Sequence, residues 1–441
     1  MRSNNLREAG PFMKIAFYTL GCKVNQYETE AMREMLEAQG YTAVEADGEP
    51  DVFLLNSCTV TAESSRKTRQ ILRKYRRLLP RAITVLVGCM PQAFPAEAEA
   101  LPEADIILGN RDAALVADAL RRYRLDGQRI VEIAPHEKGE AFTTPPVSRF
   151  SEHTRAFMKI EDGCDRYCAY CIIPTARGRV RSRGLEDIRD EARRLAGAGY
   201  KEIVLVGINL SAYGKGGEEN LSDAVEAVCG VTGVERVRLG SLEPDQMDDY
   251  MLSRMAAQPK FCPQFHLSLQ SGCDGTLRRM NRHYDTAFYK DLVLRIRRQF
   301  ANPAITTDVM VGFPGETEAD FAASAAFVEE IGFAKSHVFA YSRRSGTAAD
   351  RMDGQISRQE KESRSRRMLE AAERAQTRFL ASQVGLVCPV LFETCKDGIL
   401  EGCTPNYTFV RVPGPAALCG QIRPVAITGA EAGVCIGRMA E

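Results

Sequence analysis

Apolar runs of strand length alternate with amphipathic helical patterns in the first part of the chain. The runs 14–20, 51–57 and 82–88 are rich in β-branched and aromatic residues, and a helical pattern covers 27–39. Repeated strand–helix units predict a parallel sheet wrapped by helices, so we expect an α/β domain over residues 13–125. The following stretch, 126–153, mixes proline, charged and hydroxyl residues and is expected to be a linker.

The same alternation restarts after the expected linker. Six apolar runs with helical patterns between them lie at 155–160, 202–207, 235–241, 264–269, 304–312 and 335–342, and a long charged helical pattern follows at 357–383. A closed barrel of this kind needs eight units, so six predict an open, partial (βα)6 barrel over 154–383. Chemistry is then expected at the carboxyl ends of its strands.

The last part of the chain has a different sequence pattern, in which short strands are separated by turn residues and helical patterns are missing. Five such strands over residues 384–441 predict a small β-barrel of the oligonucleotide-binding type. The overall fold class expected for the chain is therefore α/β with a small C-terminal β-barrel.

Charge and cysteine content narrow the picture. Lys+Arg and Asp+Glu both count 58, so a polyanion would have to meet a local basic patch. No apolar span long enough for a membrane helix and no secretory signal is present in the sequence, so we expect a cytoplasmic protein with no membrane partner. Fourteen cysteines in such a chain are expected to be packed thiols, ligands or catalysts rather than disulfides.

Three cysteines stand at CxxxCxxC spacing directly after the first strand of the second domain. Cys164, Cys168 and Cys171 could wrap one face of a metal cluster, and thiolates suit iron–sulfur clusters or zinc. Structural zinc prefers four ligands, usually in CxxC pairs, whereas three ligands on a four-iron cluster leave one iron open. The alternative is three buried thiols at a strand end.

Three further cysteines, Cys22, Cys58 and Cys89, each follow a predicted strand of the first domain. If those strands are neighbours, the thiols meet at the sheet edge where open α/β sheets bind ligands. Each could instead be a small packed residue, although polar Asn25 and Asn56 nearby fit a site better than a core.

The CxxxCxxC motif, with an aromatic residue before its last cysteine, resembles the radical S-adenosylmethionine (SAM) superfamily. The resemblance implies that the open iron chelates SAM, which is cleaved to a 5′-deoxyadenosyl radical. The superfamily's Gly-Gly-Glu is replaced here by VGINLSAYG. Candidate cofactor-binding residues follow the strand ends and the motif: Tyr170, Asn209, Ser241, Gln270, Asp308 and Gly312.

The whole chain is similar to the methylthiotransferase family through TLGCKVN, NSCTVT, GCMPQ, EDGCDRYCAYCIIPTARG and LSLQSGC. The resemblance implies an auxiliary 4Fe–4S cluster on Cys22, Cys58 and Cys89, a second 4Fe–4S cluster with SAM on the other three cysteines, and a C-terminal TRAM domain that grips RNA. TLGCKVN and IIPTARGRVRSR resemble the MtaB-type branch, which methylthiolates C2 of N6-threonylcarbamoyladenosine at tRNA position 37 with two SAM.

The same resemblance implies several partners. These are a tRNA that reads ANN codons, an electron donor such as flavodoxin or ferredoxin, and a sulfur donor that the sequence does not identify; the chain is expected to act as a monomer. Alternatives are action on isopentenyladenosine tRNA or on a ribosomal protein, or a non-catalytic, redox-responsive iron–sulfur protein that binds RNA.

Arginines supply the candidate substrate contacts. The segment 66–81 holds eight Lys/Arg and no acid, which predicts either a phosphate-binding surface or a solvated helix face. Alternate arginines on an extended segment after the cysteine motif are expected to point to the barrel mouth, as are two that follow the sixth strand. We expect one of them to pair with the threonylcarbamoyl carboxylate. The candidates are Arg177, Arg179, Arg181, Arg343 and Arg344.

Overall fold

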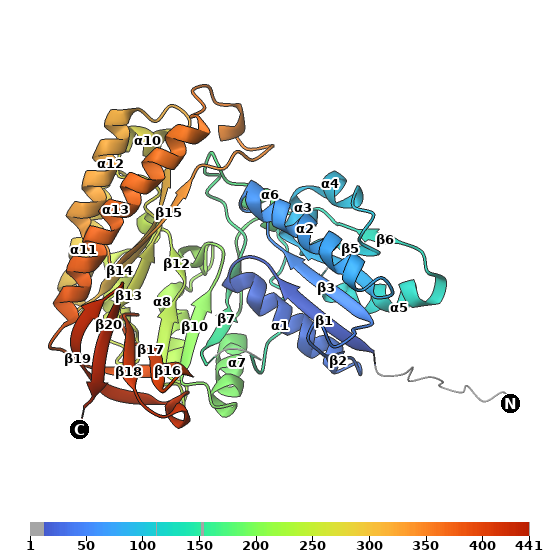
Figure 1. Ribbon diagram of the computed structural model, residues 1–441, viewed down its shortest axis with the longest axis horizontal. Coiled ribbons are helices and arrows are strands. Elements are labelled where there is room, and N and C mark those ends of the chain that lie inside the picture. The colour runs from blue at the N-terminus through green and yellow to red at the C-terminus, as the bar shows by residue number, and fades with distance from the viewer. Residues whose placement is uncertain (1–12, 112, 151–153, 441) are drawn as a thin grey trace. The chain divides into compact units, whose positions relative to one another are not determined.

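The computed structural model describes residues 13–111, 113–150 and 154–440 (Figure 1). Residues 1–12, residues 151–153 of the expected linker and the last residue of the expected C-terminal domain lie outside these ranges. The chain divides into two compact units, one of residues 1–147 and 172–178 and the other of residues 148–171 and 179–441. The short segment after the CxxxCxxC motif therefore belongs to the first unit.

The first unit is built on a six-stranded parallel sheet in the order β2-β1-β3-β4-β5-β6. Its strands are β1 (Lys14–Thr19), β2 (Thr42–Ala43), β3 (Val52–Ser57), β4 (Ile83–Gly88), β5 (Ile106–Leu108) and β6 (Ile130–Glu132). Its helices are α1 (Lys23–Glu37), α2 (Ala62–Leu78), α3 (Cys89–Ala93), α4 (Pro95–Glu99), α5 (Val116–Asp126) and α6 (Ile173–Arg177). The predicted parallel sheet is confirmed.

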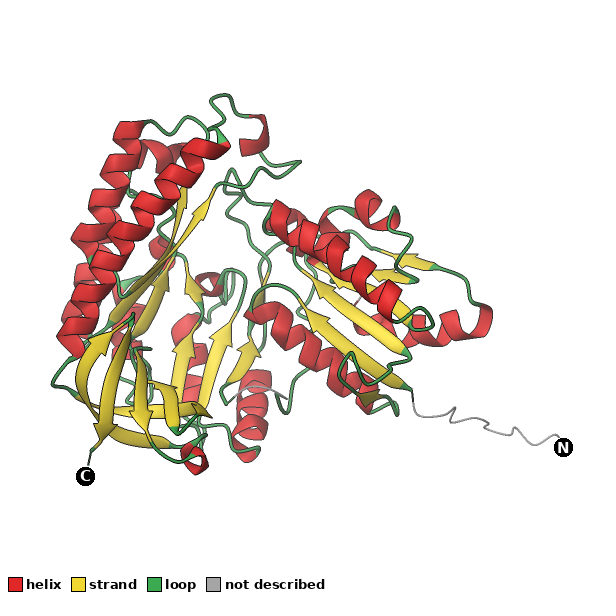
Figure 2. Cartoon of the chain, in the orientation of Figure 1, coloured by secondary structure: helices red, strands yellow, loops and turns green. Residues whose placement is uncertain are grey.

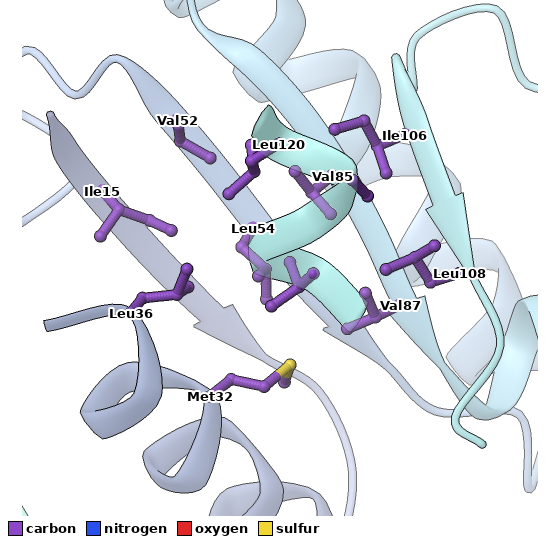
Figure 3. Packing of buried hydrophobic residues seen from close by; sticks show 12 residues of the cluster. Ile15, Met32, Leu36, Val52, Leu54, Val85, Val87, Ile106, Leu108 and Leu120 are labelled. Atoms are coloured by element: carbon purple, nitrogen blue, oxygen red, sulfur yellow. The ribbon is translucent and has the colours of Figure 1, made fainter. Parts of the chain in front are cut away.

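Helices cover both faces of this sheet because its strands are apolar on both sides. Val52 and Leu54 of β3 pack with α1 and α5, whereas Phe53 and Leu55 pack with α2, α3 and α4. Figure 3 shows the first of these two cores, in which side chains from four strands meet Met32 and Leu36. Side chains of successive strand residues point to opposite faces, so each strand contributes to both cores.

Three strands of this sheet carry little sequence signal. β2, β5 and β6 contain two or three residues each, too few for a periodic pattern to show. The strand β6 lies within 126–153, the segment expected to be a linker, and pairs with β5 at the sheet edge.

The second unit contains the six predicted strand–helix units in sequence order, and all pairs are parallel. The third strand is interrupted at Gly240, so the hydrogen-bonded sheets are β11-β10-β7 and β12-β13-β14-β15 (Figure 2). These strands are β7 (Ala156–Lys159), β10 (Glu202–Val206), β11 (Arg236–Leu239), β12 (Ser241–Leu242), β13 (Gln264–Leu267), β14 (Ala304–Val311) and β15 (Lys335–Ala340). A short antiparallel pair, β8 (Glu161–Asp162) and β9 (Arg181–Ser182), follows the first strand.

The helices of this unit follow the strands as expected. They are α7 (Leu185–Gly197), α8 (Leu221–Cys229), α9 (Asp249–Ala256), α10 (Asp274–Arg279), α11 (Thr286–Gln299), α12 (Glu318–Ile331) and α13 (Arg358–Gln383). The predicted helix at 357–383 is α13, whose N-cap is Ser357. Across the described part of the chain, none of the helices is both long and apolar enough to cross a membrane.

The C-terminal strands form a closed barrel in the order β16-β17-β18-β20-β19, which confirms the predicted small β-barrel. The strands are β16 (Val387–Lys396), β17 (Ile399–Cys403), β18 (Phe409–Pro413), β19 (Ile422–Glu431) and β20 (Val434–Met439). Arg236 and Arg238 attach this barrel to the rest of the second unit, because they donate to the carbonyl oxygens of Cys403 and Pro405 over 3.0 and 2.9 Å.

Candidate functional site

The first group of cysteines follows three strands, and these strands are neighbours in the sheet, a condition that the sequence left open. Cys22 caps α1 after β1, Cys58 follows β3, and Cys89 begins α3 directly after β4. Because β1, β3 and β4 are adjacent and parallel, their carboxyl ends meet at one edge of the sheet. Cys58 and Cys89 are buried, whereas Cys22 is exposed.

Gly21 brings the loop of Cys22 against Cys58. Its φ is +118°, and a Cβ at this position would lie 2.9 Å from Cys58 Cβ and 3.3 Å from Cys58 Sγ. Under the thiols, the amide of Asn25 donates to the Ser57 carbonyl over 3.0 Å, and its Oδ1 accepts from Cys22 Sγ over 3.4 Å. A buried polar network therefore fixes the loops that carry the thiols.

Arg177 completes this site from α6, and its place corrects one expectation. Its side chain is 1% exposed, pairs with the carboxylate of Glu28, and donates from Nε to Cys89 Sγ over 3.2 Å and from Nη2 to Asn25 Oδ1 over 3.2 Å. Residues 173–177 are helical, so Arg177 does not continue an extended row of alternating arginines. It is buried beside Cys89, whereas the sequence pattern predicted a substrate-binding arginine on an extended segment.

The thiols of Cys22, Cys58 and Cys89 interact electrostatically with one another. Burial raises the pKa of the Cys89 thiol to about 12; Arg177 acts to lower it, and Cys58 and Cys22 act to raise it further. Binding of thiolates to iron would have to displace these protons. No three Cys, His, Asp or Glu side chains in the described ranges converge on a single-ion site. A four-iron cluster differs, because each protein ligand binds its own iron and the thiols surround the cluster.

The second group of cysteines lies on the loop after β8. The amide of Cys171 donates to the Cys168 carbonyl over 2.9 Å, and Ala169 between them is bonded through its amide to Met280 and through its carbonyl to Ala349. Burial raises the pKa of the Cys164 thiol to about 12, and the neighbouring Cys168 contributes. Backbone hydrogen bonds to two other segments therefore fix this loop, and its three thiols are suitable ligands for an iron–sulfur cluster.

Arg282, which follows α10, is a site residue that the sequence pattern did not reveal. It is 8% exposed and donates from Nη1 to Cys168 Sγ over 3.2 Å. Its Nη2 pairs with Glu243 and donates to the Ser268 carbonyl over 3.1 Å. Its Nε donates to Tyr284 Oη over 3.1 Å. A buried charge far from the cysteines in sequence gives no local signal.

Two predicted cofactor-binding residues present buried acceptors without a partner among the described residues. These atoms are Asn209 Oδ1, after β10, and Gln270 Oε1, after β13. Gln270 also has a φ of +66°, which is uncommon for a residue with a side chain. Buried acceptors of this kind are normally satisfied, so both fit a ligand that carries N–H or O–H donors, as SAM does.

The other predicted cofactor-binding residues are placed differently. Tyr170 packs edge-on against Phe313 with 6.3 Å between ring centroids, and Ser241 is exposed. Asp308 Oδ2 lies 3.3 Å from Nε2 of His266. A Cβ on Gly312 would lie 2.4 Å from Lys361 Cγ, so the space expected to admit adenosine is filled on that side by α13.

Glu161 is the first residue of β8, the short strand that precedes the loop of Cys164, Cys168 and Cys171, and it is fully buried. Its Oε2 accepts from the Asn209 amide over 2.7 Å, whereas its Oε1 has no partner among the described residues. Burial and the neighbouring Asp162 hold the pKa of Glu161 well above its usual range. The local sequence gives no sign that this carboxyl belongs to the site.

The remaining candidate arginines differ in exposure. Arg181 pairs with Asp162 over 3.3 Å, and Arg344 is buried. Arg343 is exposed and pairs with Asp350, while Arg179 is exposed. Arg181 and Arg343 therefore each have a carboxylate partner within the second unit.

Only part of the predicted basic surface on α2 is free of carboxylate partners in the described structure. Four of its eight cations pair with carboxylates, three of which come from outside the helix: Arg66–Glu63, Arg69–Glu97, Arg73–Glu103 and Arg76–Asp105. The exposed cations with no carboxylate partner in the described structure are Lys67, Lys74, Arg77 and Arg81. The acids that were missing from the local sequence are supplied by tertiary structure.

Two family models match the chain. "Uncharacterized protein family UPF0004" matches residues 14–109, and "Radical SAM superfamily" matches residues 158–328. The chain is 35% identical to the threonylcarbamoyladenosine tRNA methylthiotransferase MtaB of Bacillus subtilis, over 94% of this chain and 93% of that protein. It is 37% identical to the MtaB of Thermotoga maritima, over 88% and 89%.

A relative of another specificity matches equally well. The tRNA-2-methylthio-N(6)-dimethylallyladenosine synthase of Clostridium perfringens is 36% identical over 96% of this chain and 97% of that protein. Among solved structures, the radical SAM methyltransferase TsrM of Kitasatospora setae superposes with a TM-score of 0.57 at 13% identity, covering 88% of this chain and 80% of TsrM. That likeness concerns the fold.

Proposed function

The chain belongs to the radical SAM methylthiotransferases of the MtaB type, enzymes that act on tRNA and use SAM and 4Fe–4S chemistry, and from this premise we propose its substrate. It methylthiolates C2 of N6-threonylcarbamoyladenosine at tRNA position 37. The reaction uses two SAM and two 4Fe–4S clusters, one on each group of three cysteines.

One observation carries this proposal: the chain has two separate groups of three thiols, each at the carboxyl end of parallel strands. Three protein ligands per four-iron cluster leave one coordination position open on each. One open position suits SAM, and the other suits the sulfur to be transferred.

The bound cofactors would supply a deoxyadenosyl radical, sulfur and a methyl group, chemistry that no side chain provides. The protein's own residues bind and orient. Asn209 and Gln270 offer unsatisfied acceptors to SAM, while Asn25 and Gly21 fix the loops that hold the first three thiols. We assign recognition of the threonylcarbamoyl carboxylate to exposed Arg179 and Arg343, because a guanidinium fork matches a carboxylate.

Phosphate contacts are assigned to the remaining cations of α2. Lys67, Lys74 and Arg77 are spaced by seven and three residues and so share one face of the helix. The C-terminal barrel carries five acids and four bases between residues 384 and 441, so its charge favours RNA less than this face does. We further propose that the protein acts as a monomer and that flavodoxin or ferredoxin supplies its electrons.

The substrate is tested by deleting the gene and measuring modified tRNA nucleosides by mass spectrometry. Loss of the methylthio group from threonylcarbamoyladenosine is expected. Loss from isopentenyladenosine instead, or from neither nucleoside, would reject the proposed substrate.

The two clusters are tested by iron and sulfide content after anaerobic reconstitution. A variant with Cys22, Cys58 and Cys89 all changed to alanine should lose about half its iron. The matched variant with Cys164, Cys168 and Cys171 changed should lose the other half together with 5′-deoxyadenosine formation. Unchanged iron in either variant contradicts the assignment of that group.

A further inference from the structure

The guanidinium of Arg282 contacts one cluster-forming cysteine and is locked by its other contacts. Nη1 donates to Cys168 Sγ, while the other donors engage Glu243, the Ser268 carbonyl and Tyr284. Arginine has no acceptor atom, so it donates to this sulfur whether Cys168 is a thiol or a bound thiolate. The hydrogen bond therefore persists in both states.

The surroundings of Arg282 keep its position rigid. Tyr284 Oη, which accepts from Nε, donates in turn to the Leu269 carbonyl over 2.9 Å. The guanidinium lies over the Tyr284 ring, 5.0 Å from its centroid. Because a planar guanidinium holds several donors in fixed positions, the Arg282 side chain needs to move little when the charge on the sulfur changes.

Opposite charges act on the same three cysteines. Arg282 lies within electrostatic range of Cys168, and Glu243 lies within range of Cys164. The arginine side chain is 3% exposed and that of the glutamate 11%, so solvent screens neither charge strongly. Glu243 therefore offsets part of the positive field.

The same arrangement occurs independently at the first group of cysteines. There, buried Arg177 donates to Cys89 Sγ and pairs with Glu28. Two unrelated parts of the chain thus each place a buried Arg–Glu pair with one N–H on one cysteine sulfur. Such a pair is costly to bury and contributes little to stability on its own, which favours a role tied to the sulfur.

We propose that Arg282 is a positioning residue that raises the reduction potential of the cluster on Cys164, Cys168 and Cys171, and that Glu243 limits the rise. Reduction adds one electron, supplied in the assay by dithionite, and increases the negative charge on the cluster. A fixed cation and an N–H···S hydrogen bond stabilise that reduced state. Arg282 keeps its protons, and no covalent bond of the protein forms or breaks.

The test measures midpoint potentials by redox titration followed by electron paramagnetic resonance, without SAM. It uses full-length protein with Cys22, Cys58 and Cys89 changed to alanine, so that one cluster remains. Glu243→Gln should shift the reduction equilibrium at least tenfold towards the reduced state. Adding Arg282→Met to Glu243→Gln should reverse this by at least tenfold. For one electron, a tenfold change equals about 59 mV.

Two further variants separate the proposal from a structural role. Arg282→Lys keeps the charge but loses the fork, so we expect a smaller fall in potential than with Arg282→Met. Arg238→Met is the control, because Arg238 is also a buried arginine and pairs with Glu202 without contacting these cysteines. It should leave the potential unchanged.

The double variant leaves no unpaired buried charge, so it can fold and load iron even if Arg282→Met alone cannot. Equal potentials in Glu243→Gln and the double variant, at unchanged iron content, would overturn the proposal. So would shifts of the same sign from Glu243→Gln and Arg282→Lys. The proposal rests on the cluster assignment, which fails separately if these samples contain no iron.

Discussion

Replacing Arg177 with methionine should destabilise the first unit because it leaves the carboxylate of Glu28 without its cation. Glu28 is 9% exposed, and both of its oxygens pair with this guanidinium. Removing one member of a buried ion pair costs about 3–5 kcal/mol, most of it from the charge left behind. The hydrogen bond to Cys89 Sγ adds a smaller contribution.

The assay is calorimetric unfolding of the metal-free, full-length protein at neutral pH, with Arg177→Met and the double variant Arg177→Met/Glu28→Gln compared. A change of 1 kcal/mol shifts Tm by about 2–4 °C in a unit of roughly 150 residues. The single variant should therefore lower the transition of the first unit by about 6–20 °C. The double variant should recover most of this loss, because it buries no unpaired charge.

The comparison between the two variants decides whether this reasoning holds. If the double variant is as unstable as Arg177→Met, the loss comes from packing around α6 and not from the charge of Glu28. If neither variant shifts the transition, the ion pair contributes nothing to the fold. The transition of the second unit serves as an internal control, since residues 172–178 belong to the first.

Three other predictions test the site. Gly21→Ala places a Cβ 2.9 Å from Cys58 Cβ at a φ of +118°, so we expect about half the iron of the wild type after reconstitution. Formation of 5′-deoxyadenosine, which depends on Cys164, Cys168 and Cys171, should be retained. Burial raises the pKa of Glu161 in the folded protein, whereas the unfolded chain releases this proton near pH 4.5. Above that pH the folded state therefore binds one more proton than the unfolded state, and the free energy of unfolding falls as the pH rises. The Tm advantage of Glu161→Gln over the wild type should therefore grow between pH 5 and pH 8, and a constant difference would contradict the raised pKa. Arg179→Lys and Arg343→Lys should reduce methylthiolation of threonylcarbamoyladenosine tRNA more than of isopentenyladenosine tRNA, and equal losses would exclude both residues from carboxylate recognition.

Local sequence was sufficient for the features that repeat at a fixed distance from a strand. Cys22, Cys58 and Cys89 follow strands whose apolar runs are visible without tertiary information. Parallel pairing then places the three thiols at one sheet edge, since the carboxyl ends of neighbouring parallel strands coincide. The six units of the second domain were countable for the same reason.

Local sequence was insufficient wherever a charge finds its partner far along the chain. Arg282 meets Cys168 across 114 positions, and Arg177 meets Glu28 across 149. The arginines after the cysteine motif were expected on one extended segment, but a helical turn ends at Arg177 and a strand begins at Arg181. In the same way, the segment 66–81 contains no acid because its partners Glu97 and Glu103 lie outside it.

The C-terminal barrel is another feature that depends on contacts between residues far apart in the sequence. Tyr407 is stacked by Arg155 and Arg238, whose guanidinium carbons lie 4.9 and 4.7 Å from its ring centroid. Arg155 lies just before β7, and Arg238 pairs with Glu202, the first residue of β10, so the C-terminal barrel is attached near the amino ends of these strands. The thiols and the unsatisfied acceptors of Asn209 and Gln270 stand at the carboxyl ends. The C-terminal barrel is therefore attached at the strand ends opposite to those that carry the candidate site, and its charge is nearly balanced.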